Sequence, residues 1–179
     1  MPATSHRSWR SHSMPTAKPC PNRVASATSR HGHAALRRGR VTLHNGVYFV
    51  TAATYRRIAL FRDCCAARTA ARSFEDPQVL GDACMLAWVL MPDHAHWLIQ
   101  LGATTPLGVC VGRIKSASAR EVNRACGRTG CVWAPAFHDH ALRDDEDVEV
   151  AARYLVANPL RAGLVERIGD YPYWNAVWL

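Results

Sequence analysis

Apolar and polar residues alternate or recur at helical spacing along most of the chain after residue 46. Val47 to Thr54 is rich in β-branched and aromatic residues, which predicts a strand. Met85 to Met91 is a continuous apolar run that predicts a buried strand. Residues 94–101 follow Pro92-Asp93 and alternate, so they are expected to pair with this run as a hairpin. The alternation places Ala95, Trp97, Ile99 and Leu101 on one face and His94, His96, Leu98 and Gln100 on the other.

Helical spacing marks two segments before residue 128. Asp63 to Arg72 is rich in alanine and predicts a short helix. Thr105 followed by Pro106 predicts an N-cap with proline in the first helical position. A long amphipathic helix is then expected until Gly127, because apolar residues recur at helical intervals: Leu107, Cys110, Val111, Ile114, Ala117, Val122 and Ala125.

The remaining elements complete an α+β pattern. Residues 135–142 predict a short strand, and Asp144/Asp145 is expected to open a last helix that Asn158-Pro159 ends. The apolar stripe of that helix is Val148, Ala151, Ala152 and Leu155. The order β-α-β-β-α-β plus a terminal helix predicts a ferredoxin-like antiparallel sheet with helices packed mainly on one face.

Basic charge is concentrated at the N-terminus. Residues 1–46 hold eight Lys and Arg and no Asp or Glu, whereas the other 133 residues carry 14 basic and 14 acidic groups within a net charge of +8. Residues 1–44 have neither an apolar segment nor a periodic pattern, so we expect a disordered basic tail before a domain at 45–179. The alternatives are a mitochondrial-type presequence, although the tail shows no amphipathic helix, and a shorter chain that begins at Met14.

The overall composition excludes some classes of protein. Hydrophobic residues make up 49% of the chain and charged residues 20%, as in globular proteins. A membrane span needs about 18 apolar residues in a row, and no apolar run approaches that length. The seven cysteines are odd in number and include no CxxC pair. Without a secretion signal, they indicate a reducing cytoplasm.

Two histidines could share a metal ion. His94 and His96 are two apart on a predicted strand, so their imidazoles project from one face with about 6–7 Å between Cα atoms. Two histidines on a half-exposed sheet face are an equally good interpretation. His138 and His140 form another HxH, either a second ligand pair, a DNA contact, or side chains on a sheet edge.

Tyr154 and Asn158 are four apart on the last predicted helix and are expected on one side of it. A phenol with a pKa of about 10 is a poor nucleophile until a cation stabilises the phosphorus centre that it attacks. A packed tyrosine and a helix-terminal asparagine are the structural alternatives.

Basic residues follow the polar side of the long helix, against Glu121 alone. Either they meet nucleic-acid phosphates or they form a solvated surface, and the set is Arg113, Lys115, Arg120, Arg124 and Arg128.

Several longer segments resemble one family in the same order. They are VYFVTAATYRRIALF at 47–61, WVLMPDHAHWLI at 88–99, RIKSASAREVN at 113–123, VWAPAFHDHALRDDED at 132–147, RYLVANPLRAGLV at 153–165 and the ending YPYWNAVW. From residue 44 to 179 the chain resembles the REP-associated tyrosine transposases, in the single-tyrosine branch of the HUH single-strand endonucleases. The resemblance implies the HUH endonuclease fold with a C-terminal catalytic helix.

The resemblance also implies roles for individual residues. His94 and His96 match the metal ligands, Asn158 matches the third ligand, and Tyr154 matches the nucleophile. The ion would be Mg²⁺ or Mn²⁺. The chain departs from its relatives at Ala117 and Ser118, where an aromatic often stands, and at Ala134, where a glutamine commonly follows the tryptophan.

The implied activity is that of a DNA transposase and site-specific endonuclease. It would act on single-stranded hairpin DNA of repetitive extragenic palindromes through a 5′-phosphotyrosine, as a monomer or homodimer associated with the nucleoid in the cytoplasm. The alternative is a protein that binds such hairpins without cutting. A zinc hydrolase is disfavoured because Asp93, the carboxylate next to the pair, is expected on the opposite face. Tyr171, Tyr173 and, more distantly, Ser118 are the other candidate nucleophiles.

Overall fold

The computed structural model describes residues 45–143 and 146–178. The predicted basic tail at 1–44 lies outside these residues, as does the pair Asp144/Asp145. None of the helices in the described part is long and apolar enough to cross a membrane.

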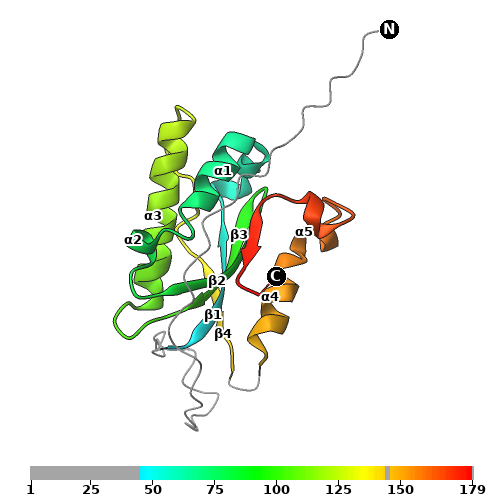
Figure 1. Cartoon of the computed structure of the whole chain (residues 1–179). Coiled ribbons are helices and arrows are strands. Elements are labelled where there is room, and N and C mark those ends of the chain that lie inside the picture. The colour runs from blue at the N-terminus through cyan, green and yellow to red at the C-terminus, as the bar shows by residue number, and fades with distance from the viewer. Residues whose placement is uncertain (1–44, 144–145, 179) are drawn as a thin grey trace.

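An antiparallel sheet forms the centre of the described structure (Figure 1). Its strand order is β4-β1-β3-β2-β5, and each neighbouring pair is antiparallel. The first four positions of this order are the ferredoxin-like arrangement, so that prediction is confirmed, whereas β5 was not predicted. The strands are β1 (Val47–Ala53), β2 (Cys84–Met91), β3 (His94–Gln100), β4 (His138–Ala141) and β5 (Trp174–Ala176).

Helices cover the two faces of the sheet unequally. Three lie on one face: α1 (Cys64–Arg72), α2 (Pro77–Leu80) and α3 (Leu107–Ala125). On the other side, the orange ribbon of Figure 1 shows α4 (Val148–Val156) and α5 (Asn158–Arg161). The prediction that helices pack mainly on one face, with a separate C-terminal helix, is confirmed. Three short 3₁₀ turns complete the elements, at Tyr55–Arg57, Leu60–Arg62 and Ile168–Asp170.

Strand β3 separates two hydrophobic cores. Ala95, Trp97 and Ile99 are fully buried against the side of α1 and α3. Leu98 points the other way and packs in a second core with Leu155 of α4. The predicted alternation is therefore confirmed, and His94 and His96 lie on the face that α4 covers.

Two helix starts differ from their predictions. The N-cap of α3 is Pro106 rather than Thr105, and no side chain caps the helix. The Thr105 side chain instead hydrogen-bonds to the Asp82 carboxyl. Together with hydrogen bonds from Thr104, this holds the pKa of Asp82 below its usual range. The N-cap of α4 is Asp147, whose side chain accepts from the amides of Glu149 and Val150. Strand β4 is also shorter than the predicted segment 135–142.

Lys115 and Ser118 of α3 hold the chain that leads into β4. The Nζ of Lys115 donates to the carbonyls of Ala134, at 2.6 Å, and Pro135, at 3.0 Å, and burial lowers its pKa. Ser118 is fully buried and its Oγ accepts from Trp133 Nε1 at 2.9 Å. Lys115 therefore joins α3 to the loop before β4, and Ser118 is too buried to act as a nucleophile.

Replacing Lys115 by Met is expected to lower the free energy of unfolding by about 1–3 kcal/mol, because the carbonyls of Ala134 and Pro135 lose a charged donor. Urea denaturation measures the change. Arg120→Met, at an exposed position of the same helix, is the matched control and should stay within about 0.5 kcal/mol of wild type. Equal stability of the two variants would contradict the structural role of Lys115.

Candidate metal and nucleophile site

His94 and His96 direct one nitrogen each toward the same point. Their Nε2 atoms are 3.1 Å apart and their rings are nearly perpendicular, at 88°. Both residues lie on β3 and project from one face, as predicted. Two ligands at right angles around an ion with metal–ligand bonds of about 2.1 Å are about 3 Å apart. The pair therefore fits two adjacent positions around one octahedral divalent ion.

The other nitrogen of each ring is held by a neighbouring side chain. Asp93 Oδ1 lies 2.6 Å from His94 Nδ1, and Thr51 Oγ1 lies 2.8 Å from His96 Nδ1. Thr51 occupies the position of β1 directly opposite His96 in the sheet register. A proton on each Nδ1 donates to the neighbouring oxygen and leaves the lone pair of each Nε2 for a metal. Metal-ligating histidines in proteins are usually oriented in this way.

The prediction for Asp93 is wrong. Alternation along a strand placed it on the opposite face, but Asp93 lies in the turn between β2 and β3, where the alternation does not apply. Its second oxygen pairs with Arg57 Nη1 at 3.2 Å. Asp93 is consequently a carboxylate that orients His94, next to the pair.

The surroundings of His96 favour its neutral form. Burial lowers the pKa of His96 to about 4, and the charges of His94, Arg161 and Arg57 act in the same direction. An unprotonated imidazole is the form that binds a metal. Within the part of the chain that the structure describes, Arg57 and Arg161 are the two guanidinium groups that act on His96.

Tyr154 and Asn158 are joined by Arg161 rather than by one continuous helix. Helix α4 ends at Val156, and Asn158 is the first residue of α5. The Arg161 guanidinium lies 3.8 Å from the centre of the Tyr154 ring. It also donates to the Tyr154 carbonyl at 2.8 Å and to Asn158 Oδ1 at 2.9 Å. The Tyr154 side chain itself is exposed, at 60%.

The amide oxygen of Asn158 thus accepts from Arg161, and its Nδ2 donates to the Leu155 carbonyl at 2.7 Å. Among the described residues, the hydrogen bonds of the Asn158 side chain join it to Leu155 and Arg161 rather than to His94 or His96. The packing of α4 against Leu98 nevertheless places the segment from Tyr154 to Asn158 on the histidine face of the sheet. Asn158, the predicted third ligand, therefore lies on the histidine face with its oxygen directed to Arg161.

Arg161 and Arg57 were not identified from the sequence. Arg161 follows Tyr154 by seven positions and Asn158 by three. The interval of three lies within α5, whereas the interval of seven crosses the break after Val156, so helical spacing alone did not indicate the contact with Tyr154. Arg57 has a positive φ of 55°, which no sequence pattern around it indicates.

The predicted basic stripe divides into separate groups. Arg113 and Arg120 border one pocket, about 470 Å³ in volume, between α2 and α3. Arg124 pairs with Glu121, and Arg128 lies beyond the helix end. Lys115 is tied to carbonyls before β4, as described above. Because α3 covers the face opposite the histidine pair, the stripe and the candidate site are on opposite sides of the sheet.

The second HxH lies on the edge strand β4. His138 and His140 are exposed, and His140 Nε2 is 3.5 Å from Glu146. His138 is opposite Thr51 in the register, and Thr51 is opposite His96. Residues opposite each other on paired strands share a face, so the second pair extends the histidine face toward the sheet edge.

Comparisons with known proteins agree on one family. The family model described as "Transposase IS200 like" matches residues 43–158. A putative REP-associated tyrosine transposase of Haemophilus influenzae is 29% identical over 98 residues, covering 49% of this chain and 56% of that protein. The REP-associated tyrosine transposase of Escherichia coli is 30% identical over 93 residues, covering 49% and 50%. The chain therefore spans about half the length of the curated relatives it matches.

A solved structure also matches. It is described as a REP-associated tyrosine transposase bound to a REP hairpin, and it is 25% identical with a TM-score of 0.59. The match covers 76% of this chain and 79% of that chain.

The contact between Asp93 and His94 can be tested through metal affinity. Asp93→Ala is expected to weaken Mn²⁺ binding by about 10–100-fold, because His94 loses the partner that orients its ring. Isothermal titration calorimetry measures the affinity. Asp170→Ala removes a carboxylate from an exposed pair with Arg167 and should leave Mn²⁺ binding unchanged. An unchanged affinity in Asp93→Ala would show that Asp93 does not support the site.

Proposed function

Since this chain belongs to the IS200-like transposase family, we propose that it cuts and rejoins single-stranded DNA with Tyr154 as the nucleophile. The observation that carries this proposal is the convergence of His94 Nε2 and His96 Nε2 on the sheet face covered by α4, the helix that presents an exposed Tyr154. A histidine pair and a phenol on the same face of a sheet suit phosphoryl transfer, in which positioning and charge stabilisation supply most of the catalysis.

The proposed substrate is hairpin DNA of the repetitive extragenic palindrome type. This is supported by the matching structure, which is described as bound to a REP hairpin. The protein would act on nucleoid DNA in the cytoplasm as a monomer or homodimer. The alternative is a protein that holds such hairpins without cutting them, and an assay for a covalent protein–DNA adduct distinguishes the two.

We assign the metal to His94 and His96, with Asn158 as the third ligand once its oxygen leaves Arg161. Two neutral imidazoles and an amide suit Mn²⁺ in affinity, whereas Mg²⁺ is favoured by abundance. Bound there, the ion would supply positive charge to a non-bridging phosphate oxygen.

In the proposed reaction the Tyr154 oxygen attacks the scissile phosphorus and its proton passes to solvent or a base. The new bond is a 5′-phosphotyrosine, and the broken P–O bond leaves a 3′ oxygen that takes up a proton to become a free 3′-OH. Because one phosphoester replaces another, the reverse reaction rejoins strands without ATP. Strand cutting and strand joining are then one reaction run in two directions.

Arg161 has a positioning role in this proposal. Its guanidinium holds the Tyr154 ring and the Asn158 oxygen at the same time. A guanidinium also binds phosphate through two parallel hydrogen bonds. A DNA phosphate that recruits Arg161 would therefore release Asn158 toward the metal and leave Tyr154 free to turn toward the phosphorus.

Tyr171 and Tyr173, the other candidate tyrosine nucleophiles, are less suited to the attack. Burial raises the pKa of Tyr171 to about 12, and its hydroxyl donates to the Leu90 carbonyl at 2.7 Å. The pKa of Tyr173 is also raised to about 12, with burial as the main cause. Raised pKa values make phenolates harder to form, so both residues are disfavoured.

Tyr154→Phe is expected to abolish nicking and the covalent protein–DNA adduct while hairpin binding persists. The substitution removes the attacking oxygen and keeps the ring that Arg161 covers. Denaturing gel electrophoresis of labelled hairpin DNA incubated with protein and Mn²⁺ detects the adduct, and a mobility shift measures binding.

The controls separate the two parts of the site. His96→Ala should also stop nicking, but it should weaken Mn²⁺ binding, which Tyr154→Phe leaves intact. Tyr171→Phe should retain the adduct. An adduct in Tyr154→Phe would place the nucleophile elsewhere, and a wild-type protein that binds hairpins without any adduct would support the non-cutting alternative.

Arg161→Ala is expected to slow single-turnover nicking at saturating DNA by about 100-fold, since the proposed phosphate contact that positions Tyr154 and Asn158 is lost. Arg161→Lys should recover part of the rate because it keeps the charge but not the planar fork. Arg167→Ala, an exposed arginine paired with Asp170, is the control. A wild-type rate in Arg161→Ala would contradict the positioning role.

A further inference from the structure

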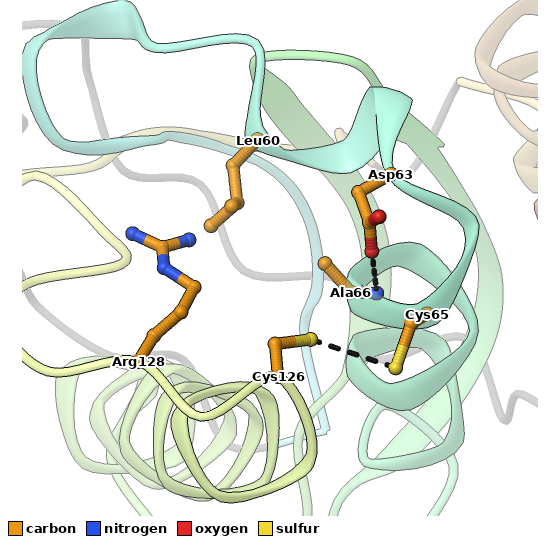
Figure 2. A pocket seen from close by; sticks show the side chains of 6 residues that line it. All are labelled: Leu60, Asp63, Cys65, Ala66, Cys126 and Arg128. Carbon is orange, nitrogen blue, oxygen red and sulfur yellow. Dashed lines mark hydrogen bonds between the residues drawn. The ribbon is translucent and has the colours of Figure 1, made fainter.

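Two thiols and a carboxylate meet between α1 and the end of α3, on the sheet face opposite the histidine pair. Cys65 and Cys126 are 61 positions apart in sequence, and their Sγ atoms are 3.5 Å apart. Asp63 is the N-cap residue of α1. One ligand atom from each of the three residues lies within 4.8 Å of the other two. Figure 2 shows the three side chains at one end of a cavity of about 340 Å³.

The spacing of these atoms fits a tetrahedral metal site better than a disulfide. Two thiolates at about 2.3 Å from a Zn²⁺ ion in tetrahedral geometry are about 3.8 Å apart. A disulfide requires an S–S distance of about 2.05 Å. The observed separation of 3.5 Å is therefore close to the metal geometry without a bond between the sulfurs.

The carboxylate has an oxygen to offer. Asp63 Oδ1 accepts from the Ala66 amide at 2.8 Å, which fixes the side chain at the start of α1. A carboxylate carries two oxygens with several acceptor positions, so Asp63 can cap the helix and still bind a metal ion. The helix start thus holds Asp63 and Cys65 in a defined relation to each other.

Charged groups of opposite sign border the candidate site. Asp63 places a carboxylate oxygen within 4.8 Å of both thiol sulfurs. Arg128 borders the same cavity, and its Nη1 is buried without a hydrogen-bond partner among the described residues. The Arg128 guanidinium lies on the side of the cavity away from Cys65 and Asp63 (Figure 2), so the carboxylate is the charged group beside the thiols.

We propose that Asp63, Cys65 and Cys126 form a Zn²⁺ site with an open fourth position. Thiolate ligands select Zn²⁺ and similar soft ions over Mg²⁺ and Mn²⁺, so this site is chemically distinct from the histidine pair. Binding one Zn²⁺ displaces the two thiol protons to solvent, with no change in oxidation state. The ion would join the start of α1 to the end of α3, and the proposal does not rest on the proposed function.

The test uses the full chain, reduced and stripped of metal, in the His96→Ala background so that the histidine pair does not compete. Titration with Co²⁺ as the probe is expected to produce a thiolate-to-cobalt charge-transfer band and tetrahedral d–d absorption, both lost when one equivalent of Zn²⁺ is added. Cys65→Ser should lower the Zn²⁺ affinity by at least about 100-fold and remove most of the charge-transfer band.

Cys131→Ser, an exposed free cysteine outside the cavity, is the matched control and should bind like the parent. Cys126→Ser provides an independent second variant should Cys65→Ser fold poorly, as judged by circular dichroism. A Co²⁺ spectrum without thiolate bands would overturn the proposal. So would bands that persist in both Cys65→Ser and Cys126→Ser.

Discussion

The two-residue alternation of β3, held between β1 and β2 at the centre of the sheet, is the constraint on which the rest of the structure depends. It directs Trp97 into the core beneath α1 and α3, and it directs His96 to the face beneath α4. A shift of one residue in the register would move the histidines into the core beneath α1 and α3 and would move Trp97 to the face covered by α4. The hydrophobic core therefore fixes the orientation of the site, and the same register brings Thr51 opposite His96.

The two faces of the sheet are chemically different. The α4 face carries the histidine pair, Asp93 and two arginines, which are suited to a hard divalent ion and phosphate oxygens. The α1 and α3 face carries the two thiols with Asp63, which are suited to a soft ion. Arg113 and Arg120 also lie on the second face. DNA that engaged both Tyr154 and these arginines would have to pass around an edge of the sheet.

Much of the fold followed from the sequence because burial imposes periodicity. The alternation at 94–101 and the helical spacing after Leu107 each correspond to an observed element. Contacts between segments distant in sequence leave no such pattern. From the sequence, Lys115 was expected among the basic residues on the polar side of the helix. In the structure its Nζ donates to carbonyls of the loop before β4. Asp93 was misplaced because a turn ends the alternation. The break between α4 and α5 and the bridging role of Arg161 depend on backbone geometry after Val156.

The central claim is that His94 and His96 present their Nε2 atoms to one divalent ion on the face covered by α4. Pulsed electron paramagnetic resonance of the Mn²⁺-loaded protein tests it most directly, because the couplings of ligand nitrogens to Mn²⁺ count the bound imidazoles. The account predicts two histidine nitrogens on one Mn²⁺, reduced to one in His96→Ala. A Mn²⁺ spectrum with no histidine nitrogen, or one unchanged by His96→Ala, would contradict it.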